Sequence, residues 1–208
     1  MMYKYPDTTI LVFCKAPIAG QVKTRLMPQL TAQAAVDIHS ELTQRVLTLL
    51  LQSQLCPIQL WCSPDRNHSF FQFCLNDYHV SLQVQQGKDL GERMLYAINH
   101  ALQQSSRVLL IGCDCPSLTI SDFDFAINAL QNTQDIVLAP AEDGGYVMIG
   151  MKRAYPELFI NKTWGHASVL KTTRQQIKRM NLNCIETVMQ WDVDTFEDLQ
   201  RYRQSKIM

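Results

Sequence analysis

The chain has 208 residues, and its 19 basic and 19 acidic side chains give a formal net charge of zero. Such a balance provides no overall field to hold a nucleic acid or an anionic membrane, so we expect neither as a partner. Seven cysteines, an odd number with no Cys-x-x-Cys pair, argue against a disulfide framework or a zinc ribbon and favour reduced thiols in a cytoplasmic protein.

Strand and helix patterns alternate through the first half of the chain. Short apolar or alternating runs predict strands, and apolar side chains at three- and four-residue intervals predict helices. The predicted strands are 9–14, 58–62 and 80–84, and the predicted helices are 31–52, 67–75 and a third that carries Leu90, Met94, Ile98 and Leu102. Thr31 is the expected N-cap of the first helix.

Residues 15–28, between the first strand and the first helix, are irregular and basic. Lys15, Lys23 and Arg25 fall within eleven residues, and Gly20 lets backbone N–H groups approach a ligand closely. A loop that leaves the first strand of an α/β sheet lies at the carboxyl edge, where ligands bind, so this segment suits a phosphate cradle. It is not a P-loop, because a second glycine directly before the lysine is missing. A solvated basic loop is the alternative interpretation.

A buried-strand pattern at residues 108–111 runs directly into an acidic residue and a proline. The continuous apolar run is typical of a central strand covered on both faces, and Pro116 ends it because proline has no N–H for the ladder. Asp114 therefore falls where ligands of open α/β sheets bind; a turn aspartate bonded to its own backbone is the alternative. Cys113 and Cys115 flank this residue, and we expect them to pack, because we find no His or Cys partner at ligand spacing.

The second half of the chain departs from simple alternation. A helix capped by Thr119 or Ser121 precedes a strand at 135–140, after which residues 141–150 form an acidic turn and a strand with no room for a crossover helix. That strand is therefore expected to be antiparallel or offset, which makes the sheet mixed. A helix at 168–180, a short strand at 183–188 and a final helix follow, the last with Thr195 as N-cap and Asp198 as its reciprocal partner.

Several polar residues have two interpretations. Arg93 lies in a first helical turn, where the macrodipole favours an acid, so it either serves a ligand or is simply exposed. Glu142 and Asp143 either bind a metal or substrate hydroxyls or form an Asp-Gly turn. His166 either contacts a ligand or is structural.

Five stretches, 13–26, 90–94, 112–118, 142–146 and 192–199, together resemble the DUF2064 family, the transferase-1 group often associated with radical-SAM and selenium-related proteins. More distantly, the chain is similar to the nucleotide-diphospho-sugar transferase superfamily. This resemblance implies the GT-A fold, a three-layer α/β/α sandwich with a mixed, mostly parallel central sheet. We expect a single domain over residues 1–208, because no repeat, low-complexity tract or linker divides them, and the apolar run at 10–14 is too short for a signal peptide or membrane span.

The resemblance also implies roles for individual residues. Asp114 and Asp194 would hold Mg²⁺ or Mn²⁺, and Asp114, Lys23 and Asp143 would be catalytic. The positions expected to bind the nucleotide and its phosphates are Lys15, Ala16, Pro17, Gly20, Lys23, Thr24, Arg25, Gly91 and Arg93. The positions expected on the acceptor side are Glu142, Asp143, Gly144, Gly145, Trp164 and His166.

These expectations describe a metal-dependent transferase with a nucleoside triphosphate or nucleotide-sugar donor and a small-molecule acceptor. The sequence does not choose between nucleotidyl and glycosyl transfer. The basic loop lacks the glycine-rich sequence common in guanylyltransferases, and Phe196 stands where a proline is frequent, so the substrate is left open, as is the oligomeric state. A non-catalytic nucleotide-binding or partner-binding protein of the same fold is the alternative, because function belongs to sites and not to folds.

Overall fold

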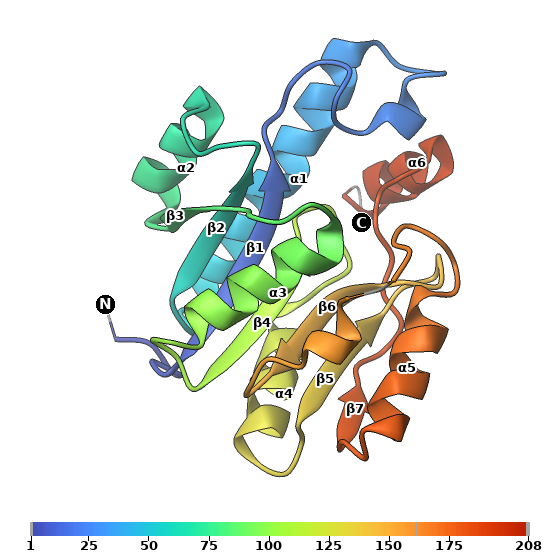
Figure 1. The fold of residues 1–208 in the computed structure, drawn as a ribbon. Coiled ribbons are helices and arrows are strands. Elements are labelled where there is room, and N and C mark those ends of the chain that lie inside the picture. Colours follow the sequence, from blue (N-terminus) through green and yellow to red (C-terminus); the bar gives the residue numbers. More distant parts are fainter. Residues whose placement is uncertain (1, 161, 207–208) are drawn as a thin grey trace.

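In the computed structural model, which describes residues 2–160 and 162–206, seven strands form one twisted sheet (Figure 1). The strands are β1 (Thr8–Lys15), β2 (Ile58–Ser63), β3 (Ser81–Val84), β4 (Arg107–Gly112), β5 (Ile136–Pro140), β6 (Tyr146–Met151) and β7 (Cys184–Glu186). Their order across the sheet is β3-β2-β1-β4-β6-β5-β7. The central strand β1 is buried almost throughout, as its apolar sequence predicts.

The sheet is mixed, as predicted, because β6 runs antiparallel to both β4 and β5 while the other pairs are parallel. The chain leaves β1 towards β2 and β3 and then returns to β4 on the other side of β1. This reversal makes the carboxyl ends of β1 and β4 a topological switch point, where open α/β sheets bind ligands. The loop after β1 and the segment after β4 therefore meet at one edge.

Helices cover both faces of the sheet. Because side chains alternate along a strand, Ile10 and Val12 of β1 face one cluster of buried residues, whereas Leu11 and Phe13 face the other. The first cluster is covered by α1 (Ala32–Ser53), α2 (Ser69–Tyr78) and α4 (Ile120–Gln131), and the second by α3 (Leu90–Ala101), α5 (Val169–Arg179) and the 3-10 turn η2 (Pro156–Leu158). The result is the predicted α/β/α sandwich.

The last helix, α6 (Phe196–Ser205), packs away from the two main layers. Leu199 and Tyr202 join Ile38 and Leu42 of α1 in a third cluster, which also includes Leu26. Leu26 belongs to η1 (Thr24–Leu26), the 3-10 turn of the basic loop. This packing holds the start of α6 against the loop that follows β1, and Figure 1 shows the two segments side by side.

The helix caps follow local sequence signals. The Thr31 hydroxyl accepts a hydrogen bond from the Ala34 N–H, and both Thr119 with Asp122 and Thr195 with Asp198 form capping boxes. Thr119 rather than Ser121 is therefore the cap of α4. Ser168 precedes α5, but its hydroxyl lies 2.9 Å from His166 Nδ1 instead of bonding to the helix.

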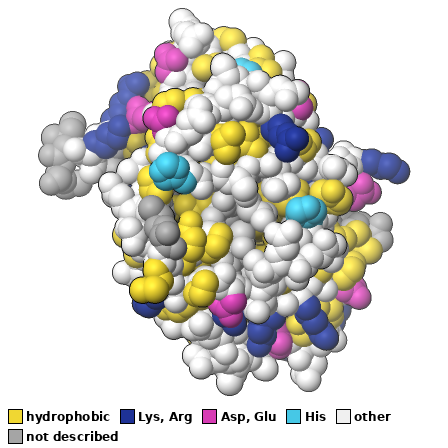
Figure 2. Space-filling model, turned by 90° about the vertical axis from the view of Figure 1, so that its left-hand side faces the viewer, with side chains coloured by type: hydrophobic (Ala, Val, Ile, Leu, Met, Phe, Trp, Pro, Cys, Tyr) yellow, Lys and Arg dark blue, Asp and Glu magenta, His cyan; other side chains and the backbone are white. Residues whose placement is uncertain are grey.

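The surface reflects the balanced charge of the chain. On the face shown in Figure 2, basic and acidic side chains are interspersed among neutral ones and form no continuous patch of one sign. Within the described part of the chain, no helix combines the length and the apolar character needed to cross a membrane.

Candidate functional site

The candidate site is built where the segment after β4 meets the segment before α6. The backbone N–H of Val193 donates to the carbonyl of Asp114 at 3.1 Å. The Ser117 hydroxyl donates to the carbonyl of Trp191 at 3.1 Å and accepts from the Trp191 N–H at 3.0 Å. Val193 is fully buried between two acids, which anchors this segment so that its carboxylates stand beside Asp114.

Three carboxylates converge here. Oxygen atoms of Asp114, Asp192 and Asp194 all lie within 4.8 Å of one another. The two predicted metal residues, Asp114 and Asp194, are thus brought together, and Asp192 is a third member that the prediction did not include. Its signal was the acid-x-acid spacing around a buried apolar residue, which places two side chains on the same side of an extended segment.

Lys23 extends from the basic loop into this cluster. Its Nζ lies 2.7 Å from Asp114 Oδ2 and 3.1 Å from Asp194 Oδ1, and its side chain is only 4% exposed. The backbone at Lys23 is left-handed, with φ of 48°, just before η1 begins. Arg25 adds a more exposed contact, with Nη1 3.2 Å from Asp194 Oδ2. The site therefore already concentrates positive charge between two acids.

The charges of this pair stabilise each other. Burial alone lowers the pKa of Lys23, but attraction to Asp114 and then Asp194 outweighs it and holds the pKa above its ordinary value. Burial likewise raises the pKa of Asp114, and the Lys23 ammonium overcomes this effect and holds that pKa below its ordinary value. Both groups are thus charged at neutral pH.

Asp192 behaves differently. Burial first, and then repulsion from Asp114, Asp194 and Asp143, raise its pKa to about 7. Like-charged neighbours disfavour the ionised form, so the site has more carboxylates than Lys23 alone can neutralise. This residual negative charge is a property that suits a bound cation.

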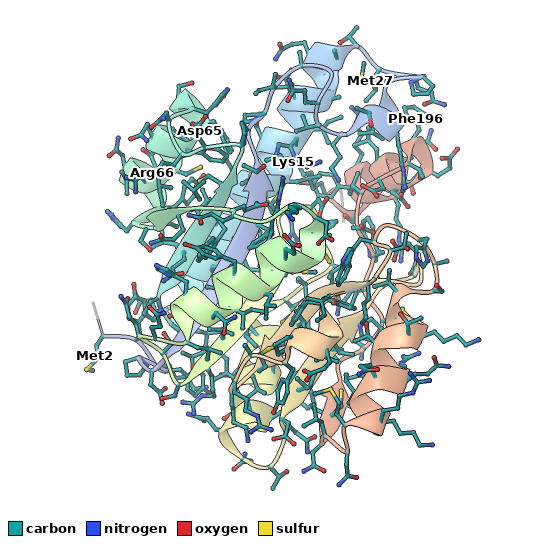
Figure 3. The ribbon with its side chains drawn as sticks, viewed as in Figure 1. Met2, Lys15, Met27, Asp65, Arg66 and Phe196 are labelled. Atoms are coloured by element: carbon teal, nitrogen blue, oxygen red, sulfur yellow. The ribbon has the colours of Figure 1, made fainter. Side chains whose placement is uncertain are left out.

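A pocket of about 300 Å³ opens over Lys23, Asp114 and Asp194. Of the predicted residues, those that line it are Lys15, Lys23, Thr24, Arg25, Asp114 and Asp194. Figure 3 places Lys15 at the end of β1, in the same upper part of the view as Met27 and Phe196. The pocket therefore lies at the switch point between β1 and β4, as the strand-end argument predicts.

Other residues expected to bind phosphate have different surroundings. Ala16 is buried and Gly20 takes a left-handed turn with φ of 81°. The Arg93 guanidinium donates to the carbonyl of Gly87 at 3.1 Å and to Ser63 Oγ at 3.4 Å, so it ties the start of α3 to the end of β2. The described residues that line the pocket include none of these, nor Pro17 and Gly91.

Gly91 is a packing residue. A Cβ built on it would lie 2.1 Å from the Phe159 carbonyl oxygen and 2.6 Å from Trp164 Nε1. Trp164 itself packs edge-on against Tyr146, with ring centroids 6.5 Å apart. Its indole therefore covers the start of α3, whereas the neighbouring Leu90 faces the pocket.

The residues expected on the acceptor side are dispersed. Glu142 forms a two-bonded ion pair with Arg201 of α6, with a shortest distance of 2.8 Å. Asp143 accepts from the N–H of Gly145 at 2.8 Å, which is the turn interpretation of the sequence. Gly144 has φ of 87° and packs against the Ala167 backbone.

His166 lies outside the pocket. It lines a separate cavity of about 550 Å³, together with Lys162 and residues of α5. The structure therefore joins the basic loop with Asp114 and Asp194, and none of the residues expected on the acceptor side is among the described residues that line this pocket.

Sequence reasoning missed a second group in the pocket. Cys14, His39 and Cys113 have ligand atoms within 4.8 Å of one another, all three are buried, and all three line the pocket. The expectation that Cys113 has no His or Cys partner is therefore wrong, because the partners come from β1 and α1. Cys115 is bonded to Ser117 and the Trp191 carbonyl, a packing role as expected.

The carboxylate group fits a hard divalent cation. Its three members offer only oxygen atoms, which Mg²⁺ and Mn²⁺ prefer. The Lys23 ammonium between Asp114 and Asp194 and the raised pKa of Asp192 both indicate a position that favours positive charge.

Comparisons with known proteins agree with this fold. The family described as "Uncharacterized protein conserved in bacteria (DUF2064)" matches residues 46–166. A crystal structure described as "putative nucleotide-diphospho-sugar transferase" from Desulfovibrio desulfuricans G20 is 31% identical, with a TM-score of 0.87 over 97% of this chain and 88% of that one. No curated protein matches the chain in sequence.

Two more distant structures share the fold alone. CMP:2-keto-3-deoxy-manno-octonic acid synthetase complexed with CTP is 8% identical, with a TM-score of 0.62 over 97% of this chain and 98% of that one. The 4-diphosphocytidyl-2C-methyl-D-erythritol synthase of Anaerococcus prevotii DSM 20548 is 10% identical, with a TM-score of 0.63 over 98% and 99%. The predicted fold class is thereby confirmed.

Proposed function

The chain belongs to the DUF2064 family, and from that premise and the pocket at the β1–β4 edge we propose that it is a metal-dependent transferase that uses a nucleotide donor. The observation that carries the proposal is Lys23, buried at the base of the pocket between Asp114 and Asp194. A buried lysine held between acids at a strand-end switch point suits phosphate chemistry better than a structural role, because a structural core has no need to bury these charges.

The donor's phosphates would lie against the basic loop. Lys15, Lys23 and Arg25 all line the pocket and together supply three positive charges. A volume of about 300 Å³ is at the lower end of small-molecule sites, which run from roughly 300 to 1,000 Å³. It suits the phosphate and sugar part of a nucleotide, with the base towards the open rim.

Asp114, Asp192 and Asp194 would hold Mg²⁺ or Mn²⁺. When bound, the cation neutralises charge on the phosphates and orients the donor. The Lys23 ammonium competes for the same oxygens in the metal-free protein, so it is expected to turn towards the donor phosphates when the cation is held. Asp192 loses its proton to bind, because a carboxylate must be ionised to act as a ligand.

Of the two reaction types, the geometry favours nucleotidyl transfer. Inverting glycosyl transfer to a hydroxyl needs a general base on the acceptor side, a task that a carboxylate can perform. Glu142 is paired with Arg201, and Asp143 is committed to its turn through Gly145. A nucleotidyl acceptor that already carries a phosphate group needs no such base, because its oxygen is ionised and attacks directly.

In that reaction an acceptor phosphate oxygen forms a bond to the α-phosphorus of a nucleoside triphosphate. The bond from the α-phosphorus to its bridging oxygen breaks, and pyrophosphate leaves with the electron pair. Lys23 and Arg25 would stabilise the charge that develops on these oxygens, an effect that is strongest where water is excluded.

A ligand panel tests this proposal. The four nucleoside triphosphates and UDP-, GDP-, CDP- and ADP-sugars are each assayed by thermal shift with and without Mg²⁺ or Mn²⁺. A ligand at 100 times its dissociation constant adds about 2.7 kcal/mol, which is roughly 5–10 °C for a chain of this size. We expect a metal-dependent triphosphate to give the shift, and the shift to be lost in Asp114→Asn but kept in the exposed control Asp77→Asn.

Turnover is then assayed as pyrophosphate release with a panel of phosphorylated acceptors. Pyrophosphate formed with the triphosphate that binds supports nucleotidyl transfer. A shift only with nucleotide sugars would favour glycosyl transfer, and binding without turnover across the panel would favour the non-catalytic alternative. No shift with any nucleotide would overturn the proposal.

A further inference from the structure

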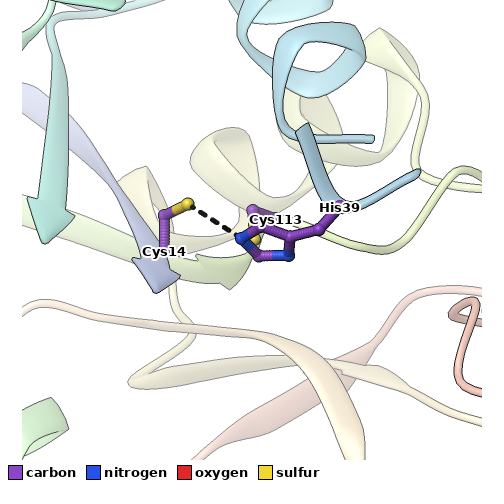
Figure 4. A group of neighbouring side chains, drawn as sticks. All are labelled: Cys14, His39 and Cys113. Carbon is purple, nitrogen blue, oxygen red and sulfur yellow. Dashed lines mark hydrogen bonds between the residues drawn. The ribbon is translucent and has the colours of Figure 1, made fainter. Parts of the chain in front are cut away.

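Cys14 of β1, His39 of α1 and Cys113, which directly follows β4, meet in the folded protein (Figure 4), and all three line the pocket. In the parallel register of β1 and β4, Phe13 pairs with Gly112, and the next residue along each chain segment is a cysteine, Cys14 within β1 and Cys113 just beyond β4. Both cysteine side chains enter the same buried cluster, and His39 reaches them from α1. The exposed fractions of Cys14, His39 and Cys113 are 1%, 5% and 5%.

The spacing of these atoms matches a metal site. Cys14 Sγ lies 3.6 Å from His39 Nε2. In tetrahedral zinc sites the Zn–S and Zn–N distances are about 2.3 and 2.0–2.1 Å, which places a sulfur and a nitrogen ligand about 3.6 Å apart. All three ligand atoms lie within 4.8 Å of one another, so they could bind one ion with only small movements.

The donor chemistry differs from that of the carboxylate group. Two thiolates and an imidazole select a softer ion, such as Zn²⁺, over Mg²⁺ or Mn²⁺. Two thiolates also balance the charge of a divalent ion. Buried thiols that only packed against apolar neighbours would have no imidazole nitrogen within this distance.

We propose that Cys14, His39 and Cys113 form a binding site for a thiolate-preferring divalent metal ion of the zinc class, distinct from the carboxylate group. All three line the pocket, so the fourth coordination position is open to a water molecule or a ligand. Three protein ligands with one open position are typical of zinc sites that act on bound molecules. This site does not depend on the proposed nucleotidyl transfer.

A hydrogen bond occupies the ligand nitrogen of His39 in the metal-free protein, and metal binding would have to break it. Nε2 lies 2.9 Å from the Lys15 carbonyl oxygen, which only accepts, so Nε2 carries the proton in the metal-free protein. Metal binding replaces this proton and those of the two thiols. The Thr43 hydroxyl, which donates to the His39 carbonyl at 2.9 Å and lies 3.6 Å from Cys14 Sγ, holds the cysteine and the helix together.

Cobalt binding by the full-length, reduced and metal-free protein tests the site. Co²⁺ reports thiolate ligands through charge-transfer absorption in the near ultraviolet and tetrahedral geometry through intense visible bands. We expect one equivalent of Co²⁺ to produce both signals and Zn²⁺ to abolish them. Absence of these bands in the wild-type protein would overturn the proposal without reference to any variant.

Matched variants identify the ligands. Cys113→Ser and His39→Gln are expected to weaken Co²⁺ binding at least tenfold, whereas Cys74→Ser, which alters another buried cysteine of the same core cluster, leaves the bands intact. Asp192→Asn also keeps the bands, because it alters only the carboxylate group. Circular dichroism confirms folding of each variant, and bands that survive in folded Cys113→Ser would refute the assignment.

A disulfide between Cys14 and Cys113 is the competing use of the two thiols. Treatment with a peroxide would oxidise both thiols, with loss of their two hydrogens as water, and mass spectrometry would detect the change. If this oxidation occurs readily, is prevented by Cys14→Ser, and the reduced protein shows no cobalt bands, the pair is a redox pair and the metal site is wrong.

Discussion

Lys23 Nζ lies 2.7 Å from Asp114 Oδ2, although the two residues are 91 positions apart in the chain. The contact exists because β1 and β4 are neighbours in the sheet and run parallel, so that the segments which follow them leave the same edge. One residue comes from the basic loop and the other from the strand-end acidic segment. The pair thus joins the two features that the sequence analysis treated separately.

Replacing the acid of this pair is expected to abolish activity. Asp114→Asn removes a carboxylate that faces both Lys23 and the proposed cation, and we expect kcat to fall by about 100-fold or more. The measurement is pyrophosphate release at saturating metal, compared with Asp77→Asn on the exposed surface of α2. A folded Asp114→Asn protein with wild-type turnover would exclude the aspartate from the mechanism.

Replacing Lys23 is expected to change the affinity for the metal ion and the affinity for the nucleotide donor in opposite directions. In Lys23→Met the ammonium no longer occupies the oxygens of Asp114 and Asp194, so Mn²⁺ alone should bind more tightly, by about tenfold. The nucleoside triphosphate should bind more weakly, because a positive charge is lost. Calorimetric titration of each ligand checks both directions, with the exposed Lys88→Met as control. Weaker Mn²⁺ binding in Lys23→Met would contradict competition between the lysine and the cation.

Asp192 is crowded by like charges, so its removal has opposite effects on stability and on metal binding. In a chelator at pH 8, Asp192→Asn should raise the free energy of unfolding by about 1–2 kcal/mol, because the cost of burying an ionised carboxylate and the repulsion from Asp114 and Asp194 are both relieved. The same change should weaken Mn²⁺ binding at least tenfold. Urea unfolding and Mn²⁺ titration measure the two effects. A lower free energy of unfolding in Asp192→Asn would show that the charged surroundings of Asp192 do not destabilise the wild-type protein.

Lys162 is expected to make the free energy of unfolding depend on pH. Its Nζ donates to Thr173 Oγ1 at 2.8 Å, and burial lowers its pKa from 10.5 to about 8. Between about pH 8 and 10.5 the unfolded chain binds more protons at this lysine than the folded protein, so stability from this group rises with pH and is least below pH 8. Lys162→Met removes the effect.

Urea unfolding at pH 7 and pH 10 measures this difference. From pH 7 to pH 10, wild-type stability relative to Lys162→Met should increase by about 1–2 kcal/mol. Comparing the two proteins cancels the contributions that other groups titrating in this range make to the free energy of unfolding. A difference that stays constant with pH would mean that the Lys162 ammonium is as well solvated in the folded protein as in the unfolded chain.

Gly91 is expected to be required by packing. The methyl group of Gly91→Ala would meet the backbone oxygen of Phe159 and the indole of Trp164, and we expect a loss of about 1–3 kcal/mol of stability. Gly20→Ala serves as comparison, because open space surrounds that position and only its positive φ opposes the substitution. Thermal unfolding measures both variants. Equal stability of Gly91→Ala and the wild-type protein would show that the contact relaxes freely.

The sequence by itself determined the features that depend on residues close together in the chain. The apolar run before Asp114 predicted the buried strand β4, which ends at Gly112, and the short turn after Pro140 predicted the antiparallel β6. The capping box of Thr195 also needs only residues three apart. In each case local sterics and hydrogen bonding decide the outcome.

Only the tertiary structure decided which distant side chains share the site. Asp192 joined the acids because Val193 is buried and bonded to the Asp114 backbone, and Cys14 met His39 and Cys113 because of strand order and helix placement. The ion pair between Glu142 and Arg201 likewise joins residues that are far apart in the chain. Such contacts follow from strand order and register, which bring together segments that no local pattern relates.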